Sequence, residues 1–180
     1  MNISPINQTS LYGLGDNLLE FINLFENNKL PNKILLSGEK GLGKSTLAYH
    51  LINYVLSKNE KFSYDKINFK INEENIYFKL TINNTNPNLF LVDIPNDKKN
   101  IDIGQIRNLI INLNKSSFNM KPRFVLIDNI DFMNTSSVNA LLKVLEEPNE
   151  KTYFILINNN RNILPTLKSR CLNYQIYLSK

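Results

Sequence analysis

The stretch that most constrains how this chain can fold is GEKGLGKST, residues 38–46. It has the spacing G-x-x-x-x-G-K-[ST] of a phosphate-binding loop. The apolar segment before it, Lys33–Ser37, predicts a short strand, and Thr46–Ser57 has apolar residues at the spacing of a helix. A strand, a glycine loop and a helix in this order indicate a nucleotide phosphate site more strongly than the loop alone.

The residue types in this loop suit a triphosphate. A polyphosphate carries many charges at short range, so it binds where several backbone N–H groups can approach it. Glycine permits that approach because it has no side chain. The loop glycines are Gly38, Gly41 and Gly43. Lys44 has the reach to contact the β- and γ-phosphates, and the Ser45 hydroxyl is expected to hold Mg²⁺.

The helix after the loop adds to the same prediction. Its N-terminus presents unpaired N–H groups and the positive end of the helix dipole, and Thr46 in its first turn is a further nucleotide-binding candidate. The alternative is a glycine turn that merely joins a strand to a helix. Whether the site is used, and for which reaction, is a separate question.

Composition places the chain among globular proteins. It has 180 residues, of which 42% are hydrophobic and 21% charged, which is ordinary for one domain with its own core. No apolar run approaches the roughly 20 residues of a membrane-spanning helix. Residues 1–10 lack the basic-then-apolar order of a signal peptide. We therefore expect a cytoplasmic protein.

The single cysteine, the single histidine and the net charge limit which other kinds of site the chain can form. Cys171 is the only cysteine, so we expect neither a disulfide nor a cysteine-based zinc site. His50 is the only histidine and is expected to be a surface or half-buried polar residue. The net charge of +5 is compatible with nucleic-acid binding, but the basic residues are dispersed along a chain rich in Asn, Lys and Ile. We therefore expect a solvated basic surface and not a dedicated DNA-binding patch.

Alternating apolar and polar segments predict the remaining elements. The further strands expected are Asn88–Asp93, Arg123–Asp128, Thr152–Ile157 and an edge-like Cys171–Leu178. The further helices expected are Asp16–Asn28, one that starts at Asp102 with Gln105 as its capping-box partner, and one that Asn134 or Thr135 caps and Pro148 ends. Residues 59–86 stay open, because 76–82 alternates like a strand yet is compatible with a helix.

Strands that alternate with helices indicate an α/β fold. We expect a five-stranded, mostly parallel sheet with helices on both faces. Right-handed crossovers then bring the carboxyl ends of the strands to one edge. The phosphate loop, Asp128 and Asn158 all follow strands, so they are predicted to form one site at that edge.

Asp128 and its neighbours complete this predicted site. A carboxylate that closes an apolar strand can bind Mg²⁺ opposite Ser45, directly or through water. The next residue is Asn129, whose amide cannot take a proton from an attacking water, so hydrolysis is expected to be slow or absent. Asn158, Asn159 and Asn160 follow the fourth predicted strand. A polar residue there, with Asn158 as the candidate, can sense the γ-phosphate by hydrogen bonding, although in a chain this rich in asparagine it can also be an ordinary loop residue.

Three further segments resemble a known family. Residues 139–148, NALLKVLEEP, resemble the helix after the Mg²⁺-binding strand in bacterial clamp-loader subunits, and residues 164–171, LPTLKSRC, resemble their Ser-Arg-Cys motif. Residues 86–89, NPNL, resemble their His-Pro-Asp-Leu signal with Asn at two polar positions. The resemblance runs from about Leu11 to Tyr177 and is specific to AAA+ clamp loaders of DNA polymerase III.

Within that group, two subunit types are plausible. The hydrolytic motor type, gamma/tau, carries four zinc-binding cysteines before its second strand and an Asp-Glu pair after its third, and this chain has neither. The delta-prime type, whose hydrolytic site is commonly degenerate, is more similar at Asp128-Asn129. The intact phosphate loop leaves nucleotide binding open. A small-molecule kinase is disfavoured, because no lid or second substrate-binding insertion is visible.

The resemblance implies a function in DNA replication. Subunits of the loader, among them gamma/tau and delta, form an arc that opens the sliding clamp and places it on primed DNA, with ATP between neighbours. Arg170 is then expected to act in trans as an arginine finger, unless it is an ordinary surface arginine. Residues 1–180 are expected to be a single AAA+ core without the family's lid and collar. ATP and Mg²⁺ are implied as ligands, and zinc is not.

Overall fold

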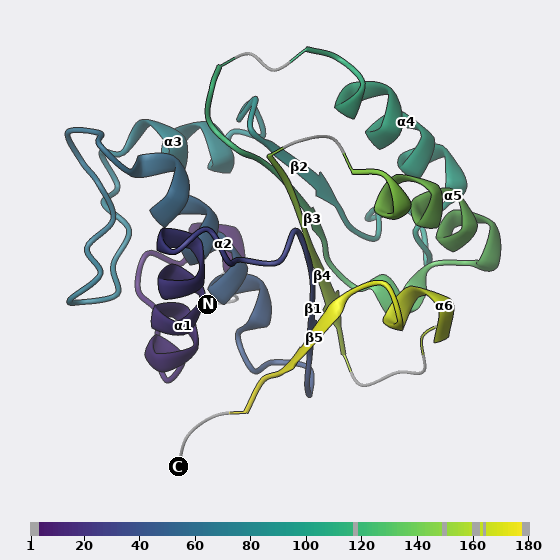
Figure 1. Ribbon diagram of the computed structural model, residues 1–180, viewed down its shortest axis with the longest axis horizontal. Coiled ribbons are helices and arrows are strands. Elements are labelled where there is room, and N and C mark those ends of the chain that lie inside the picture. The colour runs from purple at the N-terminus through teal and green to yellow at the C-terminus, as the bar shows by residue number, and fades with distance from the viewer. Residues whose placement is uncertain (1–3, 117–118, 149–150, 160–162, 164, 178–180) are drawn as a thin grey trace. The chain divides into compact units, whose positions relative to one another are not determined.

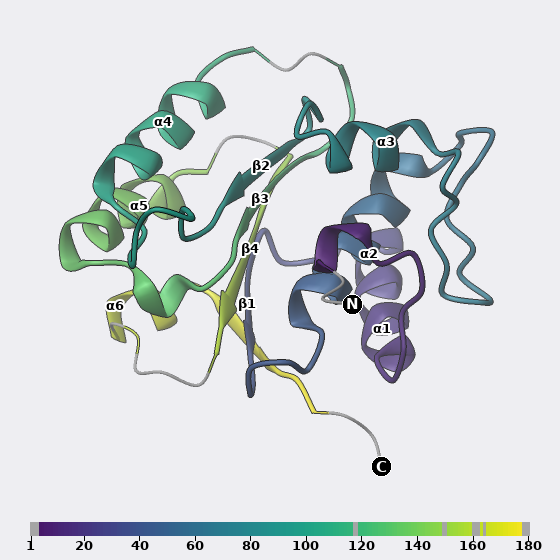
Figure 2. The same cartoon turned by 180° about the vertical axis from the view of Figure 1, so that it is seen from behind.

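The computed structural model describes residues 4–116, 119–148, 151–159, 163 and 165–177. Its ribbon is drawn from two opposite sides in Figures 1 and 2. The chain forms two compact units. Unit 1 consists of Met1–Leu30, Gly41–Asn86 and Ile176–Lys180, and unit 2 consists of Pro31–Lys40 and Pro87–Gln175.

Unit 2 contains the sheet. Its strands are β1 (Lys33–Ser37), β2 (Leu89–Val92), β3 (Arg123–Ile127), β4 (Thr152–Asn158) and β5 (Leu172–Gln175). They lie in the order β2-β3-β4-β1-β5, and every neighbouring pair is parallel. The expected α/β fold is therefore confirmed, and the sheet in the described residues is wholly parallel. The fifth strand is shorter than expected, since it ends at Gln175, and Leu178 lies outside the described residues.

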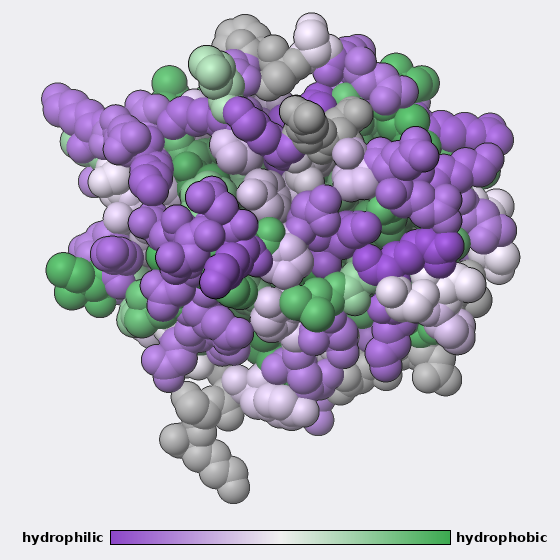
Figure 3. Space-filling view, in the orientation of Figure 1, coloured by the Kyte–Doolittle hydropathy of each residue, from purple (hydrophilic) through white to green (hydrophobic). Residues whose placement is uncertain are grey.

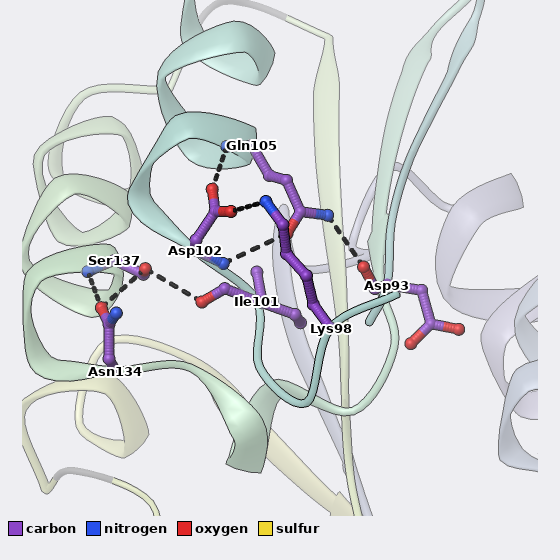
Figure 4. A network of polar contacts seen from close by, with 7 residues as sticks. All are labelled: Asp93, Lys98, Ile101, Asp102, Gln105, Asn134 and Ser137. Atoms are coloured by element: carbon purple, nitrogen blue, oxygen red, sulfur yellow. Dashed lines mark hydrogen bonds and ion pairs between the residues drawn. The ribbon is translucent and has the colours of Figure 1, made fainter. Parts of the chain in front are cut away.

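Three helices of unit 2 follow strands. They are α4 (Ile103–Leu113), α5 (Thr135–Glu146) and the short α6 (Pro165–Lys168). The predicted capping box is present in α4, where the Asp102 side chain accepts from the Gln105 N–H and the Gln105 side chain accepts from the Asp102 N–H. Figure 4 shows this pair, with Lys98 donating to Asp102. At α5, Asn134 accepts from the Ser137 N–H, as a helix N-cap does.

The core of unit 2 lies between the sheet and two of these helices. Figure 1 shows α4 and α5 side by side against the same face of the sheet. The apolar stripe of α4 and that of α5 are buried with inward-facing strand residues: Ile106, Leu109, Leu113, Val138, Leu141, Leu145, Val125, Ile127, Phe154 and Leu156. Strand residues that alternate with these, such as Ile34 and Phe124, are also buried, which is the burial pattern of a fully covered parallel sheet.

Unit 1 is helical. It contains a 3₁₀ turn at Pro5–Asn7 and the helices α1 (Gly15–Glu26), α2 (Lys44–Ser57) and α3 (Ile76–Ile82). The segment left open by the sequence is therefore a connector followed by a helix, and the strand alternative for it is wrong. Asn75 caps α3 by accepting from the Phe78 N–H at 3.1 Å, and this local bond favours the helix.

The connector between α2 and α3 is tied to the N-terminal segment. The Leu11 N–H donates to the Phe69 carbonyl at 3.0 Å, and the Ile71 N–H donates to the Thr9 carbonyl at 2.8 Å. These bonds give residues 9–11 an extended path beside residues 69–71. The N-terminal segment of unit 1 is thus held in place by a part of the chain some 60 residues away.

The face of the molecule drawn in Figure 3 is mostly polar. On the face that Figure 3 shows, hydrophilic residues predominate and hydrophobic residues form small separate areas. Within the described ranges, no helix is both long enough and apolar enough to cross a bilayer.

Candidate functional site

The glycine loop leaves β1 after Ser37 and enters α2 at Lys44. Gly41 and Gly43 have φ angles of 91° and 81°, a left-handed conformation that costs other residues about 1–2 kcal/mol. No atom lies within 4 Å of a Cβ added at Gly41. The backbone angle, and not a close contact, is therefore the reason for glycine at Gly41.

Lys44 is the first residue of α2 and is only 3% exposed. A buried lysine next to a helix N-terminus is costly unless anionic or polar groups surround it. Ser45 and Thr46 are half-buried in the same first turn. The arrangement fits the predicted roles of Lys44 at the phosphates and Ser45 at Mg²⁺, and these roles stay predictions.

A cavity of about 360 Å³ adjoins the loop within unit 1. It is lined by residues from two segments: residues 8 and 10–14 of the N-terminal segment, and residues 41–43 and 46 of the glycine loop and α2. Its volume lies within the usual range of small-molecule sites. The sequence did not predict the contribution of residues 8–14, because nothing in their composition marks them as a pocket wall.

His50 holds this wall in place, and the expectation for it was wrong. It is completely buried. Its Nε2 is 3.1 Å from the Gln8 carbonyl oxygen and its Nδ1 is 2.8 Å from the Tyr64 hydroxyl. A carbonyl only accepts, so Nε2 carries the proton and Tyr64 donates to Nδ1. Burial lowers the pKa of His50 to about 4, so the ring is neutral at physiological pH.

Three further candidates, Gly38, Asp128 and Asn158, lie at the carboxyl ends of strands in unit 2. Ser37 pairs with Asn158, and Ile127 pairs with Leu156. Gly38, Asp128 and the Asn158 side chain are thus brought to the carboxyl ends of β1, β3 and β4. Asn158 is 8% exposed, and its Oδ1 has no hydrogen-bond partner within the described residues. A buried oxygen of this kind is suited to accept from a ligand or its water.

Asn129 is fixed by hydrogen bonds on both sides. Its Nδ2 donates to Asp93 Oδ1 at 2.7 Å, and its Oδ1 accepts from Asn159 Nδ2 at 3.0 Å. Its own N–H donates to Asp128 Oδ1 at 2.8 Å. The side chain following Asp128 is therefore a bridge between the ends of β2 and β4. Asn159 was expected only as a candidate γ-phosphate sensor, and no role was predicted for Asp93, because the neighbouring strand ends follow from the sheet order. Asn160 lies outside the described residues.

Arg170 lies at the surface of unit 2, just after α6. Its Nε and Nη2 both donate to Glu146 Oε1, at 3.2 and 2.7 Å, and its Nη1 donates to the Thr166 carbonyl at 2.9 Å. The Arg170 side chain is 35% exposed and that of Glu146 54%. The guanidinium therefore does not pack inward against its own sheet. Leu164, the first residue of the Ser-Arg-Cys motif segment, lies outside the described residues.

Metal-ligating side chains are sparse in the part of the chain that the structure describes. It contains no group of three or more His, Cys, Asp or Glu residues placed to hold a metal ion. Cys171 is half-buried, and burial raises the pKa of its thiol to about 11. The thiol is therefore protonated at neutral pH and is a poor nucleophile.

The sequence as a whole settles the family. Residues 16–179 match the family described as DNA polymerase III, delta subunit. The chain belongs to this family. Among curated relatives, the DNA polymerase III subunit delta′ of Buchnera aphidicola subsp. Schizaphis graminum is 32% identical over 88% of this chain and 47% of that protein. The delta′ subunit of Pseudomonas aeruginosa is 31% identical over 77% of this chain and 40% of that protein.

The gamma/tau type is also represented among the relatives of this family member. The DNA polymerase III subunit gamma/tau of Mycoplasma genitalium is 30% identical over 94% of this chain and 27% of that protein. The chain spans about half or less of the length of these curated relatives. This chain is therefore similar in sequence both to delta′ subunits and to gamma/tau subunits.

Solved structures support the fold. A DNA polymerase III gamma subunit-related protein from Thermotoga maritima aligns with a TM-score of 0.61 at 22% identity, over 89% of this chain and 46% of that one. The RuvB Holliday junction branch migration motor of Thermotoga maritima aligns with a TM-score of 0.56 at 15% identity, over 96% and 49%. The expected AAA+ P-loop fold is confirmed.

Proposed function

We propose that this chain is the nucleotide-binding core of a delta-prime-type clamp-loader subunit of DNA polymerase III. In this proposal the subunit is a stator: it binds nucleotide, hydrolyses it slowly or not at all, and completes the active site of a neighbouring subunit. The observation that carries the proposal is Asn129, an amide held between Asp93 and Asn159 where a motor subunit has an acid.

The residues for binding Mg²⁺-ATP are present. The loop N–H groups and Lys44 are suited to the phosphates, and Ser45 and Asp128 are suited to the metal ion. Bound Mg²⁺ would neutralise charge on the phosphate oxygens. Within unit 1, the cavity beside the loop has room for a small ligand. Within unit 2, the Asn158 side chain has an oxygen without a partner in the described residues, which can accept from a water.

The position directly after Asp128 carries an amide and not an acid. A general base must accept a proton from the attacking water. The amide of Asn129 cannot do so, and both its polar atoms are already engaged. We therefore expect Asn129 to hold the sheet edge in shape and not to activate water.

Arg170 is the residue proposed to act in trans. Its guanidinium is permanently charged and lies at the surface, so it can reach the γ-phosphate held by a neighbouring gamma/tau-type subunit. The partners in this proposal are the gamma/tau and delta subunits, and through them the sliding clamp and primed DNA, in the cytoplasm. Membership of the family and the similarity to delta′ subunits support it.

Steady-state ATP hydrolysis by the purified full-length protein tests the stator role. The proposal predicts turnover far below about 1 s⁻¹, the lower end of ordinary enzymes, and no change on Lys44→Ala. Turnover near that value that disappears in Lys44→Ala would instead support the alternative, a gamma/tau-type motor. The intact phosphate loop and the similarity to the Mycoplasma gamma/tau subunit favour that alternative.

A further inference from the structure

Arg170 does not extend freely from the surface. Two of its nitrogens, Nε and Nη2, donate to the same oxygen of Glu146, and the third, Nη1, donates to the Thr166 carbonyl. Bonds to all three nitrogens fix both the direction of the side chain and the plane of the guanidinium. A long side chain with many rotamers is thereby restricted to one orientation.

Both anchors of this arrangement lie next to buried residues of helices in unit 2. Glu146 is the last residue of α5, directly after Leu145, which is completely buried. The Leu145 carbonyl also accepts from Lys33 Nζ at 3.1 Å, which ties the end of α5 to β1. Thr166 belongs to α6, which is fixed by the completely buried Leu167. The carboxylate and the carbonyl therefore present fixed acceptors to Arg170.

Stability does not account for the pair. The Glu146 and Arg170 side chains are 54% and 35% exposed, and ion pairs this accessible to water contribute little to folding. Their consequence is geometric. Within the described residues, the contacts of Arg170 leave one N–H on each terminal nitrogen unused. Two terminal N–H groups of a guanidinium suit the oxygens of a phosphate.

We propose that Glu146 is a positioning residue that fixes Arg170 for a phosphate bound outside this chain. The inference rests on the proposed function, in which that phosphate is the γ-phosphate of ATP on a neighbouring subunit. Glu146 and Thr166 accept from Nε and from one N–H of each terminal nitrogen of Arg170. The second N–H of each terminal nitrogen donates to the phosphate. Because the orientation is set before the phosphate arrives, less conformational entropy is lost when the charge develops in the transition state.

The test is ATP hydrolysis by the complete loader, reconstituted with the full-length form of this subunit. Arg170→Ala is expected to lower the kcat of the neighbouring subunit by about 10³-fold. Glu146→Ala is expected to lower kcat by about 10-fold with little change in KM for ATP, because the guanidinium is present but no longer oriented. Glu146→Gln keeps an oxygen that can accept from Nε and Nη2 and is expected to restore most of kcat.

Glu147→Ala is the matched control. Glu147 is the next acidic residue at the end of the same helix and is exposed, so removing it changes the net charge equally, and kcat is expected to stay unchanged. Incorporation of each variant into the loader is checked by size-exclusion chromatography. In the Arg170→Ala background, Glu146→Ala is expected to cause no further loss, because the two residues act as a unit.

The outcomes separate the two proposals. If Arg170→Ala lowers kcat but Glu146→Ala leaves kcat unchanged or raises it, the positioning role is overturned and the stator function stands. A loss with Glu146→Gln or Glu147→Ala as large as that with Glu146→Ala also overturns it, because the effect is then one of charge. If Arg170→Ala itself has no effect, both the trans-acting arginine and its positioning by Glu146 fail.

Discussion

The phosphate loop has features suited to nucleotide binding, whereas the position after Asp128 has no group suited to activating water. The loop has the glycines at left-handed angles, the buried Lys44 and an adjoining cavity. The position after Asp128 has an amide that is already bound on both sides. Binding a triphosphate and activating water against it are separable tasks, and the proposed function assigns to this chain the residues for the first and not those for the second.

The largest effect is expected at Lys44. Replacing it by alanine removes a charged donor from the phosphates and should weaken binding of a fluorescent ATP analogue by about 10²-fold. Lys40→Ala is the control, because Lys40 lies in the same loop but is exposed, and it should bind within a factor of about 2 of the unchanged protein. Equal losses in both variants would mean that the loop attracts nucleotide only by its net charge.

Lowering the pH is expected to reduce the stability of the folded protein through His50, which contacts Gln8 in the pocket wall. Its pKa is about 4 when folded, against a usual 6.5. Between these values the unfolded chain binds more protons, so stability falls as the pH decreases. The free energy of unfolding in urea should drop by about 2 kcal/mol from pH 7 to pH 5 through this residue. In His50→Gln that part of the pH dependence should be missing; an equally steep profile would contradict the assignment.

The bridge at Asn129 is expected to resist conversion into an acid. Asn129→Asp places a second carboxylate where Nδ2 now lies 2.7 Å from Asp93 Oδ1. Repulsion and the lost hydrogen bond should lower stability by about 1–2 kcal/mol. Adding Asp93→Asn re-forms an acid–amide pair and should recover most of that loss in urea unfolding. Additive losses in the double variant would show that the two side chains do not interact.

The smallest effect is expected at the loop glycines. Gly43→Ala forces a side chain into a left-handed angle and should lower stability by about 1 kcal/mol in thermal unfolding. A Cβ there would lie 3.4 Å from Leu14, whereas at Gly41 no atom lies within 4 Å. Because the backbone angle is the cause in both, Gly41→Ala should lose about as much. A loss at Gly43 alone would point to the contact with Leu14.

Local signals explain what the sequence predicted well. The strand Lys33–Ser37 was predicted to the residue, since an apolar run next to a glycine loop leaves little choice. The capping box of Asp102 and Gln105 was likewise visible in adjacent residues. At α3 the alternation of apolar residues was ambiguous, and the deciding contact was the Asn75 cap.

Long-range partners explain what the sequence missed. Nothing near His50 in the chain indicates that Gln8 and Tyr64 enclose it. The bridge from Asp93 through Asn129 to Asn159 requires the strand order β2-β3-β4, which the alternation of strands and helices does not specify. The contact of Arg170 with Glu146 joins residues 24 positions apart, although each belongs to a segment that resembles a clamp-loader motif.

The chemical state of bound nucleotide tests the central claim most directly. The full-length protein, in molar excess over radiolabelled ATP, is mixed with that ATP and Mg²⁺. Samples are quenched in acid at intervals over several minutes, and the ratio of ADP to ATP is measured in each. We predict that the nucleotide is bound and recovered as intact ATP, and that Lys44→Ala retains much less of it, in line with its weaker binding. Conversion of the bound ATP to ADP within seconds would show that Asn129 does not prevent hydrolysis, and would contradict the account.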